Sequence, residues 1–191
     1  MQRVKDATVV LAGRSTLDER TRLLVEMLTA MGSRSTRVEY RRLDVDRGEA
    51  VARLVRDIAD TFGSLHGVMH SAGVTRDSFI LKKDPRELAE VLTPKVAGCV
   101  NLDRMCQDLD FFVLFSSLTG TVGNPGQADY ASANAFMDAF AHYRNTLVRE
   151  SQRWGRTLLI NWPLWREGGM RVDPGSEKLM QRGRCSGFDP H

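Results

Sequence analysis

Short apolar runs alternate with longer segments of helical periodicity along most of the chain, and this alternation constrains the fold more than any other feature. Runs such as FFVLF at 111–115 are continuously apolar, as expected for strands covered on both faces. We expect strands at 7–11, 37–45, 65–70, 111–115 and 157–162, and helices at 18–31, 47–62, from Asp84-Pro85 onward, from Pro94 to about Cys106, and at 129–150. This order predicts an α/β fold of three layers, αβα, around an open parallel sheet.

Polar residues or glycines follow each predicted strand at its carboxyl end. They are Gly13-Arg14-Ser15, Asp44, Ser71-Ala72-Gly73, Ser116-Ser117 and Asn161-Trp162-Pro163. Each motif alone is typical of a simple turn. Because ligands bind beyond the carboxyl ends of the strands in open parallel sheets, the motifs together predict one binding crevice.

Composition excludes several other classes of protein. No apolar run approaches the ~18 residues that span a membrane, and the amino terminus lacks the apolar core of a signal peptide, so we expect a cytoplasmic protein. The net charge of +3 arises from 27 basic and 24 acidic residues scattered along the chain, which gives no support for nucleic-acid binding. Neither the three cysteines nor the four histidines have the spacing of metal ligands, so no metal site is expected.

The segment from Ser116 to Asn134 combines a Ser- and Gly-rich loop with a helix that carries Tyr130. Such a tyrosine is typical of an oxidoreductase that protonates a substrate oxygen, but a lysine usually follows it by four residues. Here that position is Asn134. The segment is therefore a defective active site, a coincidence, or a site with a different arrangement.

The chain resembles the ketoreductase domain of modular polyketide synthases, a branch of the short-chain dehydrogenase/reductase superfamily with a Rossmann-like fold. The resemblance rests on VVLAGRS, LDV, HGVMHSAGV, LTPKVAG, FFVLFSS, GNPGQADYASANAF, INWPLW and GGM, which occur in the family's order. In these ketoreductases the lysine comes from an earlier helix, and an asparagine follows the tyrosine by four. The resemblance identifies Lys95 as that lysine and Asn134 as that asparagine.

The resemblance implies a catalytic role for four residues. Tyr130 would donate its phenolic proton, and Ser117 would hydrogen-bond the carbonyl oxygen of the substrate. Lys95 would lower the pKa of Tyr130 from about 10, and Asn134 would hold Lys95 or a water that relays protons. Each residue alone has a structural reading: a solvated lysine, a strand-end cap, a packing tyrosine and a helix-surface asparagine.

The resemblance also implies a nucleotide cofactor, for which NADPH is preferred. A guanidinium at Arg14 suits a ribose 2′-phosphate, whereas an acidic residue there would favour NAD. The other positions implied for the cofactor are Gly13 and Ser15 beside it, Asp44 and Val45 at the adenine, Ser71, Ala72 and Gly73 at the ribose, and Asn161, Trp162 and Pro163 near the nicotinamide, together with Tyr130 and Lys95.

Two positions bear on the stereochemistry of the product. Asp77 retains the last acid of the Leu-Asp-Asp motif of D-hydroxy ketoreductases, and Pro125 precedes Tyr130 by five, as in that class. The tryptophan that marks the L-hydroxy class is replaced by Val122. The D-hydroxy product is therefore expected.

One departure from the family is a missing Gly-rich turn and its strand, which would sit between the strands at 7–11 and 65–70. We therefore expect a partial ketoreductase domain over 1–170, with an irregular tail or partial lid at 171–191. The leading hypothesis is reduction of a β-ketoacyl thioester on an acyl carrier protein, beside other polyketide synthase domains. The alternatives are a truncated, non-catalytic structural fragment of a synthase and, less favoured, a stand-alone dehydrogenase of small alcohols.

Overall fold

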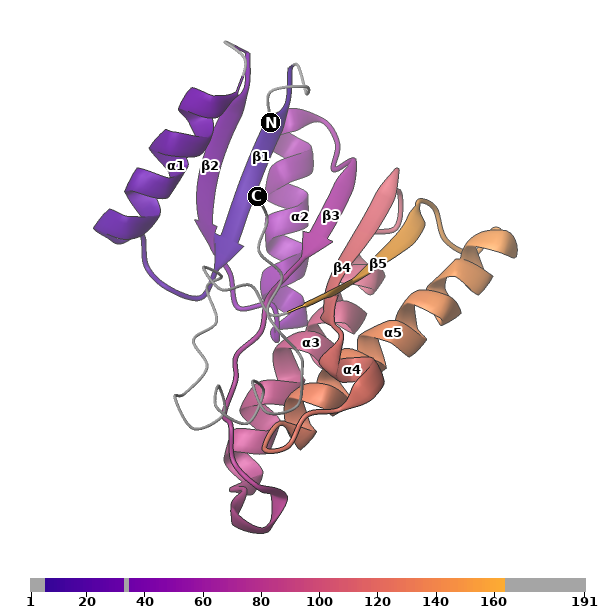
Figure 1. Ribbon diagram of the computed structural model, residues 1–191. Helices are drawn as coiled ribbons and strands as arrows, with labels where there is room; N and C mark the ends of the chain where they lie inside the picture. The colour runs from indigo at the N-terminus through magenta and orange to yellow at the C-terminus, as the bar shows by residue number, and fades with distance from the viewer. Residues whose placement is uncertain (1–5, 33–34, 164–191) are drawn as a thin grey trace. The chain divides into compact units, whose positions relative to one another are not determined.

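The computed structural model describes residues 6–32 and 35–163, which form a Rossmann-like α/β structure of parallel strands and flanking helices (Figure 1). They divide into two compact units, one ending at Ser64 and one beginning at Leu65. The tail predicted at 171–191 lies outside the described residues. No helix in the described ranges is long and apolar enough to cross a bilayer.

The first unit contains two parallel strands and two helices. These are β1 (Thr8–Gly13), α1 (Glu19–Met31), β2 (Arg37–Arg42) and α2 (Gly48–Phe62). Gly13 lies opposite Arg42 in the ladder, so the two strands end at the same level. Helix α1 lies along β2 (Figure 1). The segments that follow β1 and β2 therefore meet at one edge of the unit.

Local sequence explains where the first-unit helices begin and end. The Asp18 carboxylate accepts a hydrogen bond from the Thr21 amide (2.8 Å), which caps the amino terminus of α1. Helix α2 ends at Gly63, whose φ of 87° is readily accessible only to a residue without a side chain. Both helix ends agree with the sequence prediction.

The second unit is built on a parallel sheet in the order β3-β4-β5. Its strands are β3 (Gly67–His70), β4 (Phe111–Ser117) and β5 (Arg156–Trp162), and its helices are the 3₁₀ helix η1 (Ile80–Lys82), α3 (Pro85–Met105), α4 (Thr119–Val122) and α5 (Ala128–Arg149). Helix α5 packs against β4, β5 and α3. Phe112 and Leu114 of the central strand are fully buried, as its continuous apolar sequence predicts.

Helix α3 corrects one prediction, because it runs unbroken through Pro94 where two helical segments were expected. A proline inside a helix removes one backbone hydrogen bond and usually bends or breaks the helix. Here Val91 and Cys99, on either side of Pro94, are both completely buried. Packing of both halves of the helix outweighs the lost bond.

The sheet also differs in detail from one continuous sheet. Among the described residues, β1 pairs with β2 alone, and no ladder joins β1 to β3. These are the two strands that were expected to flank a missing neighbour. The fold class is confirmed, with the strands divided between a two-stranded and a three-stranded sheet.

A buried arginine ties together the end of the second unit where β5 begins. The Arg144 side chain is completely buried and donates to Asp103 (2.8 Å), Thr157 (3.0 Å) and the Trp154 carbonyl (2.8 Å). Its guanidinium also lies over the Phe112 ring, 5.1 Å from the centroid. These contacts connect α3, α5 and β5, and no sequence motif predicts them.

Candidate active site

Lys95 lies near the middle of α3, and only 3% of its surface is exposed. Its Nζ donates to the Phe115 carbonyl at 3.1 Å and to Met137 Sδ at 3.6 Å. The same ammonium lies over the ring of Tyr130, 5.8 Å from the centroid. This lysine is therefore an interior residue, and its structural reading as a solvated surface lysine is wrong.

Burial changes the acidity of Lys95. Removal from water disfavours the ammonium and lowers the pKa of Lys95 to about 8, with Cys99 and Asp138 opposing the shift. Burial also raises the pKa of the Cys99 thiol to about 12, so Cys99 is a neutral packing residue at neutral pH. Lys95 thus titrates near physiological pH and can exchange a proton there.

Tyr130 is 7% exposed and lies in the first turns of α5. Burial raises its pKa above the ordinary value of 10, while hydrogen bonds from the side chains of Ser117 and Asn134 lower it. The expected lowering by Lys95 is not what the structure shows, because burial dominates and the opposing effects come from these two neutral side chains. The phenol is therefore protonated at neutral pH, as a proton donor requires.

Ser117 is the last residue of β4, where the sheet register places it opposite Trp162 of β5. Its Oγ accepts a hydrogen bond from the Thr119 amide (3.2 Å), which fixes the turn into α4. The Ser117 side chain also hydrogen-bonds Tyr130, and this contact lowers the pKa of the phenol. Ser117 and Tyr130 are thus brought together as predicted.

Asn134 is completely buried one turn beyond Tyr130, so it is not a helix-surface residue. Its Nδ2 donates to the Tyr130 carbonyl at 2.7 Å, and among the described residues its Oδ1 accepts no hydrogen bond. The expectation that Asn134 holds Lys95 is therefore wrong for this structure, because Lys95 bonds Phe115 and Met137 instead. Its orphaned Oδ1 leaves an acceptor for a water, which is the other role expected of it.

A polar network surrounds Asp138, a residue that was not predicted to belong to the site. The Ser116 hydroxyl donates to Asp138 Oδ1 at 2.6 Å, and the Asn161 amide donates to Oδ2 at 3.3 Å. The negative charge of Asp138 raises the pKa of Lys95, so this carboxylate lies near the ammonium. Its position eight residues beyond Tyr130, on the same helix face, was the available signal.

His70, the last residue of β3, is another functional neighbour that was missed. It is 3% exposed, and its Nε2 lies 3.1 Å from the carbonyl oxygen of Pro94, next to Lys95. Burial, aided by the Lys95 charge, lowers the pKa of His70 to about 4. The imidazole is therefore neutral near pH 7 and donates to Pro94 in the turn that carries the lysine.

The glycine predicted to line the cofactor ribose packs closely on Lys95. A Cβ at Gly73 would lie 3.0 Å from Lys95 Cε, so a larger residue would require a small shift of the lysine side chain. Ser71 and Ala72, just before it, are exposed after β3.

Trp162, at the end of β5, stacks on Phe115 with ring centroids 5.6 Å apart, and Pro163 follows it as the last described residue. The predicted positions Ser71 to Gly73 and Asn161 to Pro163 thus lie at strand ends of the second unit.

The two positions tied to stereochemistry lie in loops of the second unit. Asp77 accepts a hydrogen bond from Gln127 Nε2 at 3.0 Å, and Gln127 in turn accepts from Asn124 at 2.9 Å. Pro125 lies exposed between those two amides in sequence. Asp77 is thereby held against the segment that leads into α5 and Tyr130.

In the first unit, the predicted cofactor residues gather at the edge where β1 and β2 end. The Leu43 amide donates to the Gly13 carbonyl (2.8 Å), and Arg42 Nε donates to the Arg14 carbonyl (3.0 Å). The Tyr40 hydroxyl donates to the Ser15 carbonyl at 2.7 Å. These bonds fix the 13–15 turn through its backbone and leave the Arg14 side chain exposed.

Asp44 and Val45 follow β2 at this same edge. Val45 is buried, and the neighbouring Asp46 has a raised pKa, chiefly through burial and also through Asp44, with Arg14 opposing. That opposing effect shows that the Arg14 guanidinium lies near this loop. Arg14 makes no ion pair with the described residues, so its charge is available to a phosphate.

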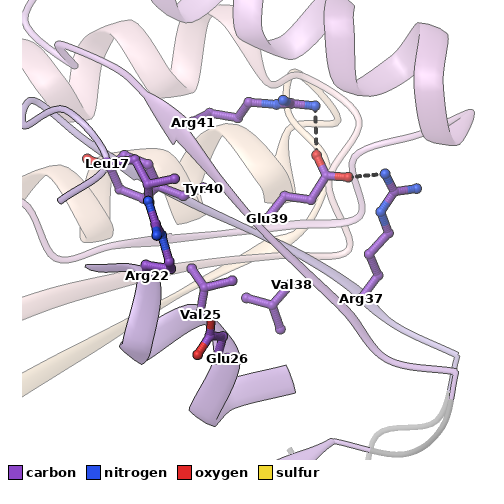
Figure 2. A pocket seen from close by; sticks show the side chains of 9 residues that line it. All are labelled: Leu17, Arg22, Val25, Glu26, Arg37, Val38, Glu39, Tyr40 and Arg41. Carbon is purple, nitrogen blue, oxygen red and sulfur yellow. Dashed lines mark ion pairs between the residues drawn. The ribbon is translucent and has the colours of Figure 1, made fainter. Parts of the chain in front are cut away.

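A separate open pocket in the first unit lies between α1 and β2 (Figure 2). Its lining comprises Leu17, Arg22, Val25, Glu26, Arg37, Val38, Glu39, Tyr40 and Arg41. The Glu39 carboxylate in its wall is already paired with Arg37 and Arg41 (Figure 2). The pocket contains none of the predicted site residues. We therefore place the candidate active site at the strand ends, where the titratable groups gather.

The parallel sheet, with a buried lysine, a serine, a tyrosine and an asparagine beyond β4, defines a short-chain dehydrogenase/reductase type of domain. In the described ranges, no three His, Cys, Asp or Glu side chains gather to hold a metal. The KR domain family matches residues 1–167 of the chain. The chain belongs to this ketoreductase family, as the sequence resemblance indicated.

Similar proteins agree with this assignment. The polyketide synthases PksN and PksL of Bacillus subtilis strain 168 are 49% and 45% identical to the chain over 181 and 179 residues, respectively. The matches cover 94% and 93% of this chain but only 3% and 4% of those proteins. The crystal structure of a ketoreductase domain from the bacillaene assembly line superposes with a TM-score of 0.88 at 45% identity, covering 95% of this chain and 43% of that one.

Proposed function

We propose that this chain is a catalytic ketoreductase domain that reduces a β-ketoacyl thioester to a β-hydroxyacyl thioester in polyketide biosynthesis. The observation that carries the proposal is the cluster of buried Lys95, Tyr130 and Asn134 with half-buried Ser117 at one edge of the second unit. Relatives named polyketide synthases support the substrate class. The substrate chain would be carried by the phosphopantetheine arm of an acyl carrier protein, beside other domains of the synthase. We propose that the domain extends over 1–170.

Three of these residues would have different roles in moving the proton to the substrate. The Ser117 hydroxyl would donate to the substrate oxygen and polarise the carbonyl. The Tyr130 phenol, kept protonated by burial, would transfer its proton to that oxygen as negative charge develops there. Lys95, with a pKa near 8, would then help to restore the proton to Tyr130, by way of a water held at Asn134 Oδ1.

We propose NADPH as the reductant, which supplies the hydride when it is bound. In the first unit, the Arg14 guanidinium is exposed and pairs with no carboxylate of the described residues, so it fits a 2′-phosphate. Asp44 and Val45 would meet the adenine. In the second unit, the turn ending at Gly73 and the end of β5 would hold the nicotinamide and its ribose. We propose a D-hydroxy product, supported by Asp77 and Pro125.

An assay of β-ketothioester reduction with NADPH tests the proposal. The decrease in absorbance of the reduced cofactor measures the rate. The expected result is a β-hydroxy product from the wild-type chain and turnover at least about 100-fold slower in Tyr130→Phe, with chiral chromatography reporting the configuration. Equal rates for both proteins would refute the proton-donor role. If the folded wild-type chain neither turns over nor is stabilised against heat by NADPH, the alternative of a non-catalytic synthase module would replace the proposal.

A further inference from the structure

Lys83 and Asp129 form a buried ion pair that the catalytic scheme does not use. Lys83 Nζ lies 2.8 Å from Asp129 Oδ2, and the two side chains are only 4% and 0% exposed. Lysine and aspartate are rarely buried this fully unless they are paired. The contact is an ion pair without hydrogen-bond geometry, since among the described residues Oδ2 accepts no hydrogen bond.

Each partner also holds a different segment of the chain. Asp129 Oδ1 accepts a hydrogen bond from the Tyr130 amide at 2.9 Å, so it contacts the backbone of the residue that carries the phenol. Lys83 Nζ donates to the Arg76 carbonyl in the loop after β3. The pair therefore joins the loop of residues 76–83 to the first turn of α5.

Other contacts link the same two segments. The Ser78 amide donates to the Gly126 carbonyl at 2.8 Å, and Gln127 donates to Asp77 at 3.0 Å. These bonds hold the approach to α5, whereas the Lys83–Asp129 pair contacts the helix itself, next to Tyr130. The carboxylate also lies in the first turn of α5, where the helix dipole favours a negative charge.

A buried ion pair contributes little net stability compared with apolar residues of similar size, because desolvation offsets the attraction between the charges. Its effect is instead to require one geometry, since either charge left alone would be buried without a partner. We propose that Lys83 and Asp129 are positioning residues that hold Tyr130 against Ser117. This inference rests on the proposed function, in which Tyr130 donates the proton.

Tyrosine NMR tests the inference without requiring turnover. The chain has three tyrosines, so labelling of the phenolic carbon gives three resonances, and Tyr130→Phe assigns one of them. In the wild-type chain, Ser117→Ala should move the Tyr130 resonance at neutral pH, because the two hydroxyls interact. In a Lys83→Met background, the same Ser117→Ala change should move that resonance by less than about half as much, since contacting residues couple and separated ones do not.

The matched control is Lys82→Met, which removes the adjacent, exposed lysine, for which no described ion pair exists. In that background the full effect of Ser117→Ala should persist. An undiminished effect in Lys83→Met would overturn the proposal. If Lys83→Met does not fold, the double variant Lys83→Met/Asp129→Leu leaves no unpaired charge in the interior and is subject to the same criterion.

Kinetics provides a second readout. In an active wild-type chain, Lys83→Met should lower kcat by at least about tenfold, because small displacements of a catalytic group are costly. The KM of Lys83→Met should change little, and so should both kinetic constants of Lys82→Met. A change confined to the KM of Lys83→Met would contradict the positioning role. If the wild-type chain shows no turnover at all, the proposed function fails, while the NMR comparison still decides whether Lys83 positions Tyr130.

Discussion

The ammonium of Lys95 lies over the aromatic ring of Tyr130, 5.8 Å from its centroid, inside the protein. Both side chains are buried, and burial shifts their two pKa values in opposite directions: that of Lys95 falls to about 8, and that of Tyr130 rises. Each shift favours the uncharged form of its group. The site therefore holds a protonated phenol beside an amine that gains or loses its proton near physiological pH.

Removing the phenolic hydroxyl tests the proton donor directly. Tyr130→Phe should lower kcat for a β-ketothioester by at least about 100-fold, because positioned general acids contribute about that much or more. The melting temperature should change little, since the ring and its packing are retained. Tyr143→Phe is a suitable control because that tyrosine is more than half exposed. A Tyr130→Phe variant with wild-type turnover would exclude the assigned role.

Replacing the buried lysine should separate stability from activity. The folded chain binds the Lys95 proton only up to about pH 8, whereas the unfolded chain binds it up to 10.5, so wild-type stability should rise with pH between these values. Lys95→Met should therefore raise the free energy of unfolding near pH 7 by about 3 kcal/mol and flatten this rise, while abolishing turnover. Urea unfolding at several pH values measures both effects. If Lys95→Met were less stable than the wild type near pH 7, the buried charge of Lys95 would be stabilising, contrary to this prediction.

The carboxylate of Asp138 should tune Lys95. Because Asp138 raises the pKa of Lys95, Asp138→Asn should lower that pKa further below about 8. The asparagine can still accept the hydrogen bond from Ser116, although its NH2 group cannot accept the one from the Asn161 amide. An NMR titration of the Lys95 side chain measures the midpoint, with the exposed Asp110→Asn as the control. An unchanged or higher midpoint would contradict the electrostatic role of Asp138.

His70 should make the fold sensitive to mild acid. Its folded-state pKa is lowered to about 4 from 6.5, so the unfolded chain binds a proton first and stability falls as the pH drops below 6.5. At pH 5 the contribution to this loss should be about 2 kcal/mol, and His70→Gln should remove it. Denaturant unfolding near pH 7 and pH 5 provides the measurement, with the exposed His142→Gln as the control. Equal acid sensitivity in wild type and His70→Gln would exclude this histidine as the cause.

Arg144 should be essential for stability even though it lies away from the chemistry. Among the described residues, Arg144→Met leaves the buried carboxylate of Asp103 with Arg153 as its one cationic partner, and it removes the donor to the carbonyls of Trp154 and Gly155. Loss of one member of a buried ion pair destabilises proteins by about 3–5 kcal/mol, and we expect a loss of about 3 kcal/mol here. The exposed Arg149→Met is the matched control in denaturant unfolding. Identical stability of the two variants would show that the contacts of Arg144 between α3, α5 and β5 do not stabilise the fold.

The sequence by itself determined the order of strands and helices, the polar residues at the strand ends and the family. These features depend on local periodicity and on motifs, such as Tyr130 followed by Asn134, that can be read along a single segment. The continuous helix through Pro94 could not be predicted this way, because its cause is the burial of Val91 and Cys99 by other parts of the chain.

Only the tertiary structure decided how the site residues are charged and held. Lys95 bonds a carbonyl 20 positions away, and Arg144 meets Asp103 across 41 positions. The Lys83–Asp129 pair likewise joins two distant segments. Burial and charge pairing set the pKa values and fix the side chains, and both depend on which distant residues exclude water from a group. The sequence therefore indicated which residues could react, and the packing determined their protonation and their contacts.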